Sequence, residues 1–397
     1  MIDVRAGSML SDQAITIEHG VIVGVVSQRE YKSVPGEVTI DLTHATVLPG
    51  LIDAHTHITL DDFSEHSALS TSFPREALTG AKNAKITLEA GFTTIRNLGA
   101  NAFTDIALRD AIDAGDLPGP RIYASGPPLG ITGGHCDNNI LPFEYHDVAG
   151  GVADGVSAVQ HKVREVIKYG ADVVKFCATG GIMSKGDDPN AAQYTLEEMK
   201  ALVADSHRLG RKVAAHAHGL QGIKWAVEAG VDSVEHGSYI DDEAIEMMKQ
   251  HGTYLVPTLY TITWFLENLD QGDVPEYSKR KARIVAPVAQ KNLAHAITSG
   301  IKIAMGSDVP VFPHGMNARE LEAYVKAGMS PAEALRTATV NAADLLGQSE
   351  HLGSIGPGKW ADMIAIDGDP LRDIDTLQSV KFVMKGGVIY RNDYGTH

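Results

Sequence analysis

The feature that most constrains the fold of this chain is an alternation of short apolar runs with longer stretches of helical period. Eight runs rich in Val, Ile and Ala are candidate strands, at 46–54, 93–98, 121–125, 172–177, 212–217, 232–236, 254–259 and 301–306. Helical stretches lie between them at 76–90, 157–169, 195–209, 220–229, 241–251 and 317–327. Such repeated alternation is typical of a parallel sheet covered by helices. Eight units predict a (β/α)8 TIM barrel.

Two helix starts have a clear physical basis. Thr195 with Glu198, and Ser330 with Glu333, have the spacing of a capping box. Pro331 suits the first helical position, where its missing N–H costs nothing. We therefore expect helices to begin at both sites, the second running over 330–346.

The two ends of the chain have a different pattern of predicted secondary structure. Residues 1–45 and 351–397 contain strand-like runs such as ITIEHGVIVGVV and VKFVMKGGVIYR. Within each of these two segments, no helical stretch separates the strands. We expect them to pair into one small β-sandwich domain and leave a catalytic barrel at 46–350. Two Gly-rich polar segments, 126–154 and 178–194, are long for barrel connections and are predicted to cover the barrel mouth.

Composition excludes several classes of protein. With 397 residues, 44% hydrophobic and 21% charged, the chain can bury a substantial core, and no apolar stretch reaches the roughly 18 residues of a membrane span. A net charge of -16 without clustered Lys or Arg argues against nucleic acid as a partner. Only Cys136 and Cys177 are present, too few for a disulfide framework, and the segment beginning MIDVRAG has neither the basic start nor the long apolar stretch of a signal peptide. We expect a cytoplasmic protein without a membrane partner.

Ionisable residues lie at or near the ends of several of these apolar runs, including the first and the last. They are His55, His57, Lys175, His216, His236 and Asp308. In a TIM barrel the active site forms at the carboxyl ends of the strands, so these side chains should converge. Imidazoles and carboxylates are metal ligands, and this set suits a binuclear metal site.

His55 and His57 are two residues apart at a strand end, so both rings point to one side and can reach one cation. Such a pair is also found without a metal, but here it follows Asp53 in a run that enters a barrel strand. His216 and His236 end two successive later strands and can supply imidazoles to a second metal.

Lys175 is unusual because the run DVVKFCA buries its ammonium among apolar neighbours. Burial lowers the pKa of a lysine and makes the free amine available. A free amine can add carbon dioxide, and the resulting carbamate is a two-oxygen anion able to bridge two cations. A buried Lys-carboxylate pair and a Schiff-base lysine are the alternatives.

Asp308 and His218 are candidate catalytic residues. The carboxylate of Asp308 can bind one metal, take a proton from a bridging water and pass it to the leaving group; the alternative is that it caps the following turn. His218 lies two residues beyond His216 and can be a metal ligand, a substrate contact or a rim histidine. We favour a substrate contact in the catalytic site.

The motifs PGLIDAHTH, the strand lysine, HAH, EHG, GSD and GxxxPGKxAD together resemble the amidohydrolase superfamily over essentially the whole chain. TGGH at 132–135, VVKFCATGG at 173–181 and Tyr194 before TLEEM are similar to one branch of it. That branch contains Xaa-Pro dipeptidases, arginine-type metallocarboxypeptidases and ochratoxinase-like amidases. The sequence departs from it at Asn97, where relatives often carry Asp, and we expect this to weaken an internal ion pair with Arg96.

The resemblance implies hydrolysis of an amide that joins an acyl group to a C-terminal amino acid, including aromatic amides of the ochratoxin type. It implies two zinc ions, bridged by a CO2-derived carbamate on Lys175, that hold the attacking hydroxide. The same six residues named above become the metal ligands. It also implies a homo-oligomer, such as an octamer. By ligand type alone Zn, Mn, Co and Fe suit the site about equally.

A substrate with a terminal carboxylate needs a hydrogen-bond donor near the barrel mouth. His135, Tyr194 and His218 are the candidates. For Tyr194 the alternative is a packed aromatic residue at a helix start. Lys185, in GIMSKGDDPNAAQ, is a further candidate whose alternative is simple solvation.

Two other functions stay open at this point. A cyclic amide hydrolase of the imidazolonepropionase type would use the same metals without the carboxylate donor, and lactams assayed beside N-acyl amino acids would separate the two. A non-catalytic barrel scaffold is the alternative from another class. Such scaffolds usually lose metal ligands, whereas all six positions here keep metal-competent residues.

Overall fold

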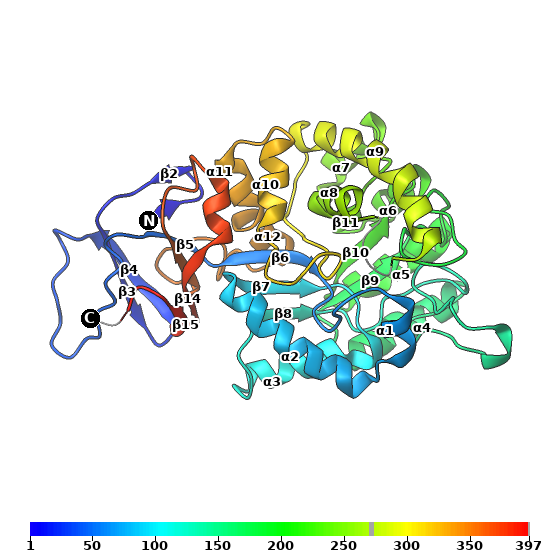
Figure 1. The fold of residues 1–397 in the computed structure, drawn as a ribbon, viewed down its shortest axis with the longest axis horizontal. Helices are drawn as coiled ribbons and strands as arrows, with labels where there is room; N and C mark the ends of the chain where they lie inside the picture. Colours follow the sequence, from blue (N-terminus) through cyan, green and yellow to red (C-terminus); the bar gives the residue numbers. More distant parts are fainter. Residues whose placement is uncertain (270–273, 396–397) are drawn as a thin grey trace.

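The computed structural model describes residues 1–269 and 274–395. Parallel strands form a barrel that is surrounded by helices, and strands from both chain ends form a separate group at one side of it (Figure 1). The predicted fold class, a (β/α)8 TIM barrel with a small β-sandwich domain built from the termini, is confirmed.

The barrel strands occur in the predicted places. They are β6 (Leu51–Thr56), β7 (Phe92–Asn97), β8 (Arg121–Ala124), β9 (Val173–Cys177), β10 (Lys212–Ala217), β11 (Ser233–His236) and β12 (Tyr254–Val256). They pair in parallel as β6-β7-β8 and as β12-β11-β10-β9. Residues 301–309 take the eighth position through isolated parallel bridges, Leu255 with Ile303 and Thr56 with Val309, and the bridge between Leu129 and Phe176 closes the other gap.

Helices cover the outside of the barrel. They are α1 (Glu65–Ser70), α2 (Phe73–Glu89), α3 (Thr104–Asp113), α4 (Val156–Lys168), α5 (Leu196–Arg208), α6 (Leu220–Ala229), α7 (Asp242–His251), α8 (Leu259–Asn268), α9 (Glu276–Thr298), α10 (Arg319–Lys326), α11 (Pro331–Thr337) and α12 (Val340–Leu345). Both predicted capping boxes are present, at Thr195 and Ser330. Within the two described ranges no helix has the length and apolar character needed to cross a membrane.

The helix predicted over 330–346 consists of two helices. Thr339 lies between α11 and α12 with φ -134° and ψ -99°, outside the helical region. Its hydroxyl donates to the carbonyl oxygen of Leu335, and this local bond competes with continued helix geometry.

The strands of the chain ends pair with one another. They are β1 (Ile2–Asp3), β2 (Ser8–Met9), β3 (Gln13–Glu18), β4 (Val21–Ser27), β5 (Thr46–Pro49), β13 (Met363–Ile366), β14 (Val380–Lys385) and β15 (Val388–Asn392). The main sheet has the order β15-β14-β13-β5, and the β3-β4 hairpin packs on it through a core that includes Ile22, Met363 and Phe382. The run predicted as one strand at 46–54 is therefore two, β5 in this sheet and β6 in the barrel. Gly50 separates them at a point where a Cβ atom would collide with Thr93.

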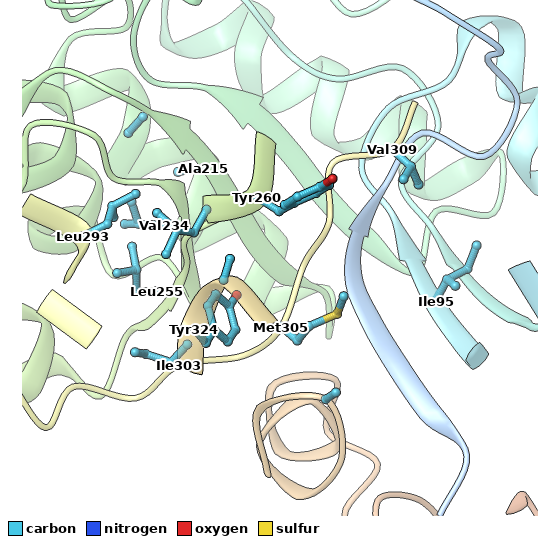
Figure 2. Packing of buried hydrophobic residues seen from close by; sticks show 14 of the residues in the cluster. Ile95, Ala215, Val234, Leu255, Tyr260, Leu293, Ile303, Met305, Val309 and Tyr324 are labelled. Carbon is cyan, nitrogen blue, oxygen red and sulfur yellow. The ribbon is translucent and has the colours of Figure 1, made fainter. Parts of the chain in front are cut away.

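The barrel strands are held by a continuous apolar core. Figure 2 shows Val234, Leu255 and Ile303 from neighbouring barrel segments beside Leu293 of α9 and Tyr324 of α10, all of them buried. This packing fixes the strands, whose carboxyl ends carry the residues described next.

Candidate metal centre

A cavity of about 530 Å³ opens at the carboxyl ends of the barrel strands. All six residues predicted as metal ligands line it, namely His55, His57, Lys175, His216, His236 and Asp308. They come from β6, β9, β10, β11 and the 301–309 segment, so residues more than 250 positions apart meet at one place.

Asp308 lies close to both His55 on β6 and His57 just after that strand. Its Oδ1 atom is 3.4 Å from Nε2 of His55 and 3.3 Å from Nε2 of His57. His55, His236 and Asp308 each offer a ligand atom, and these three atoms lie within 4.8 Å of one another. One divalent cation can therefore be held by these side chains without a change of the backbone.

Two of these residues have an unusual backbone. His236 has φ 70° and Asp308 has φ 63°, in the left-handed region that non-glycine residues seldom adopt. Such conformations persist where the surrounding structure enforces them, and they cluster at functional sites. In His236 the ring is also held from the side, because Nδ1 lies 2.8 Å from the hydroxyl oxygen of Thr258.

Lys175 is 3% exposed and lies inside the barrel on β9. Burial lowers the pKa of its ammonium to about 8, against the opposing charges of Glu235 and Asp308. A substantial fraction of the free amine is therefore available near neutral pH, which is the condition for reaction with carbon dioxide.

The remaining imidazoles form a compact group. The ring of His216 lies 4.7 Å from those of His236 and His218, measured between centroids. Burial lowers the pKa of His216 and His236 well below the usual range, and that of His218 to about 3. These rings are thus neutral at pH 7 and keep a lone pair for a cation.

A buried charge pair that the sequence did not reveal lies beneath His55. Glu235 accepts hydrogen bonds from Arg96 at 2.9 Å and from Ser233, and its other oxygen lies 2.8 Å from Nδ1 of His55. Burial opposes its ionisation, but the charge of Arg96 and the contact with His55 lower the pKa of Glu235 to about 2. The only signal in the sequence was a charged residue in the buried run SVEH, directly before a predicted ligand.

The expectation for Asn97 needs a correction. Arg96 keeps an ion pair, but with Glu235 rather than with its neighbour in sequence. Asn97 instead accepts from the backbone N–H of Ile58 at 2.6 Å and donates to Asp105 at 3.1 Å. Because successive strand residues point to opposite sides, Arg96 faces into the barrel and Asn97 faces away from it.

The three candidates for a substrate carboxylate are placed differently. His135 and His218 line the cavity, and the ring of His135 stacks on that of His216 at 4.2 Å. Nδ1 of His218 lies 2.7 Å from the hydroxyl oxygen of Ser238. Tyr194 is 1% exposed, packs near Phe176 and is not among the residues that line the cavity.

The two long segments predicted to cover the barrel mouth contribute to the cavity wall. His135 and Cys136 come from the first segment, and Ser184 and Lys185 from the second. The side chain of Lys281 on α9 holds the second segment, donating to the carbonyl oxygens of Gly181 at 2.8 Å and Ser184 at 2.7 Å, and pairing with Asp187.

The two cysteines are joined by a disulfide, with 6.1 Å between their Cα atoms. Because two cysteines are too few for a disulfide framework, the sequence did not predict this bond. Their 41-residue separation hid the contact, which depends on how the 126–154 segment folds back over β9.

These donors fit a divalent metal ion, with His55, His236 and Asp308 as one candidate set of ligands. Imidazole nitrogen and carboxylate oxygen suit zinc and similar first-row metals. The amine of Lys175 becomes an anionic oxygen ligand once it carries a carbamate, and its lowered pKa of about 8 favours that reaction.

Comparisons with known proteins agree with this site. The profile described as "Amidohydrolase family" matches residues 46–390. Ochratoxinase of Aspergillus niger is 36% identical, over 97% of this chain and 84% of that protein. A crystal structure of a Xaa-Pro dipeptidase with bound methionine in the active site has a TM-score of 0.93 and 37% identity, and covers 98% of each chain. A prolidase complexed with N-methylphosphonate-L-proline has a TM-score of 0.91 and 30% identity, over 98% of this chain and 97% of that one.

The match to the family extends over the barrel and most of the C-terminal strands, and these relatives cover nearly the whole chain. They are enzymes named for hydrolysis of amide or peptide bonds, in agreement with the predicted branch. This chain therefore belongs to the amidohydrolase family and is a hydrolase of amide or peptide bonds.

Proposed function

We propose that this protein is a binuclear metal-dependent amidohydrolase that cleaves the amide between an acyl group and a C-terminal amino acid. The observation that carries the proposal is the convergence of four imidazoles, Lys175 and Asp308 on one cavity. His135 and Lys185 on the same cavity wall are suitable partners for a substrate carboxylate.

We assign the metal-binding roles as follows. His55 and His57 hold one ion, His216 and His236 hold the second, and Asp308 completes the site. A carbamate on Lys175 would supply a further anionic oxygen ligand to these ions. Zinc is the metal we propose, because the donor set fits it.

When bound, two such ions lower the pKa of a shared water and polarise the scissile carbonyl. Proton transfer and substrate orientation are carried out by side chains. Asp308 accepts the proton of the water at Oδ1 and delivers it to the nitrogen of the leaving amine. His218 is held by Ser238 at the edge of the site, where it can donate to the substrate. His135 and Lys185 orient the substrate through its carboxylate.

We also propose a cytoplasmic homo-oligomer. The cytoplasm rests on composition and the oligomer on resemblance to the family, whereas the disulfide between Cys136 and Cys177 is a bond that a reducing compartment disfavours.

Two measurements on one protein preparation test the proposed function. Free amino acid release is measured from N-acyl amino acids, Xaa-Pro and Xaa-Arg dipeptides, ochratoxin A and lactams, with metal content determined on the same preparation. About two metal ions per chain together with cleavage of one linear amide class is the expected result. Cleavage of lactams alone would favour the cyclic amide alternative. Absence of metal after supplementation would favour a scaffold.

A further inference from the structure

Glu76 on α2 is a buried carboxylate with an unused oxygen. The residue is 5% exposed, and its Oε1 atom accepts from the side-chain amide of Asn101 at 2.9 Å. Among the residues that the structure describes, no donor reaches its Oε2 atom. A buried carboxylate oxygen without a donor is costly, so a cationic donor at this place is strongly favoured. Both Glu76 and Asn101 line the catalytic cavity.

The position of Glu76 relative to the histidines can be followed through ring contacts. They run from His57 to His55 at 5.5 Å, to His236 at 5.0 Å, to His216 at 4.7 Å and to His135 at 4.2 Å, measured between centroids. The series thus connects His57 with His135 around the ends of the barrel strands.

Glu76 is connected to the His57 part of the cavity wall. Its partner Asn101 is two residues from Gly99, whose carbonyl oxygen lies 3.4 Å from Nδ1 of His57. His135 and Lys185, the proposed carboxylate partners, come from the 126–154 and 178–194 segments of the cavity wall.

The wall around Glu76 is predominantly acidic. Asp61, Asp62 and Glu65 also line the cavity on this side, and only Asp61 has a lysine partner, Lys82 at 2.6 Å. Arg75 lines the cavity too, but it is exposed and no ion pair joins it to Glu76 in the described ranges. Burial raises the pKa of Glu76, as expected for a carboxylate that lacks a cation.

We propose that Glu76 binds a cationic nitrogen on the acyl side of the scissile amide. This inference rests on the proposed function and deepens it. The proposed carboxylate partners and Glu76 belong to different segments of the cavity wall, so the group that Glu76 meets is placed on the acyl part of the substrate. The favoured substrates are then dipeptides with a free N-terminal ammonium, or ones with a basic acyl-side chain. Neutral N-acyl amino acids leave Oε2 of Glu76 unpaired.

The test compares three substrates with the same C-terminal residue. They are a dipeptide with norleucine on the acyl side and a free ammonium, its N-acetyl analogue, and the same N-acetyl dipeptide with lysine in place of norleucine. The second and third differ only in a side-chain ammonium, so they separate the two sources of positive charge. The wild-type protein should have the highest kcat/KM for one of the two cationic substrates.

Glu76→Gln keeps an oxygen for Asn101 and removes the charge. It should lower kcat/KM for the preferred cationic substrate by about ten- to hundredfold, the range for a hydrogen bond to a charged group, and leave the N-acetyl dipeptide unchanged. Glu89→Gln, at the far end of α2 with a partly exposed side chain, is the matched control and should change neither value. Equal losses for charged and neutral substrates would overturn the proposal.

Binding provides a readout that does not need turnover. Calorimetry on Asp308→Asn protein, with and without Glu76→Gln, compares the affinity of the free dipeptide with that of its N-acetyl analogue. Loss of the preference on removal of the Glu76 charge supports the subsite even if no linear amide is cleaved. Persistence of the preference contradicts it, whatever the activity assay shows. If Glu76→Gln fails to fold, Glu76→Asp, which keeps the charge on a shorter side chain, should retain the preference at reduced affinity.

Discussion

Nδ1 of His55 lies 2.8 Å from a carboxylate oxygen of Glu235, and both side chains are buried. A carboxylate at this position fixes the proton on Nδ1. The lone pair of Nε2, which faces Asp308, is then free to bind a metal. Arg96 neutralises the second oxygen of Glu235, so the charge stays ionised inside the barrel. The orientation of a predicted metal ligand thus depends on an ion pair from two other strands.

Removing the charge of Glu235 should weaken metal binding. Glu235→Gln breaks the pair with Arg96 and allows the ring of His55 to rotate, so metal affinity should fall about 10- to 100-fold, as for other partners of metal-binding histidines. Competition with a chelator, read by metal analysis, measures it. Glu228→Gln, an exposed glutamate paired with Lys200, is the control. Unchanged affinity in Glu235→Gln protein would mean that the contact does not orient His55.

Much of this arrangement is readable from the sequence. Buried parallel strands are apolar along their whole length, which is why β9 and β10 stand out as runs. Their carboxyl ends meet in a barrel, so Lys175 and His216 could be brought together without knowledge of the structure. The periodicity also separates barrel from terminal strands, except at Gly50, where one run enters two sheets.

Contacts that depend on irregular segments could not be predicted. His135 meets His216 only because the 126–154 segment folds back over β9, and a loop path has no periodic signature. Glu235 was hidden for another reason. Its partner Arg96 is 139 residues away, and sequence spacing gives no measure of a pairing across the barrel.

Lys175 offers a direct test of the carbamate. Lys175→Ala removes the proposed carbamate ligand, so metal content should fall below that of the wild-type protein and amide hydrolysis should be lost. A small carboxylic acid such as propionate fits the space that the side chain leaves, and it should restore part of the activity. Lys200→Ala, on the exposed face of α5, should behave as wild type and show no response to propionate. Full activity of Lys175→Ala protein without the acid contradicts a role of the carbamate as a ligand.

Asp308→Asn should abolish proton transfer while preserving the fold. Asn tolerates the left-handed backbone that Asp308 adopts at φ 63°, so the variant isolates the loss of charge. We expect kcat to fall by about 10²- to 10⁴-fold, the usual contribution of a general acid or base. Thermal melting should show that the variant is folded. Activity within a few-fold of wild type would remove Asp308 from the mechanism.

The disulfide between Cys136 and Cys177 should stabilise the folded protein. It closes a loop of 41 residues and ties the segment that carries His135 to β9. Cys136→Ser should therefore lower the free energy of unfolding by about 2–4 kcal/mol, a typical range for such bonds. A reductant should lower the melting temperature of the wild-type protein toward that of Cys136→Ser and leave the variant unaffected. Two free thiols in protein purified without reductant would show that the bond is not formed.

Acid should destabilise the protein in part through His314. Its Nε2 atom lies 3.0 Å from the carbonyl oxygen of Leu60, its Nδ1 atom is buried without a partner in the described ranges, and burial lowers its pKa to about 4. An unfolded histidine has a pKa of about 6.5. Between these two values the unfolded chain binds more protons than the folded one. The stabilisation by a neutral His314 is therefore present above pH 6.5 and is lost as the pH falls toward 4.

His314→Gln cannot take up that proton. Its apparent melting temperature should fall less steeply than that of the wild-type protein between pH 6.5 and 4, a difference of up to about 3 kcal/mol in stability. Both proteins must be compared at equal metal content, because burial also lowers the pKa of histidines that line the cavity, such as His135 and His218. His251→Gln, at the exposed end of α7, is the control and should follow the wild-type curve. Parallel curves for His314→Gln and wild type would show that His314 is protonated equally in the folded and unfolded states.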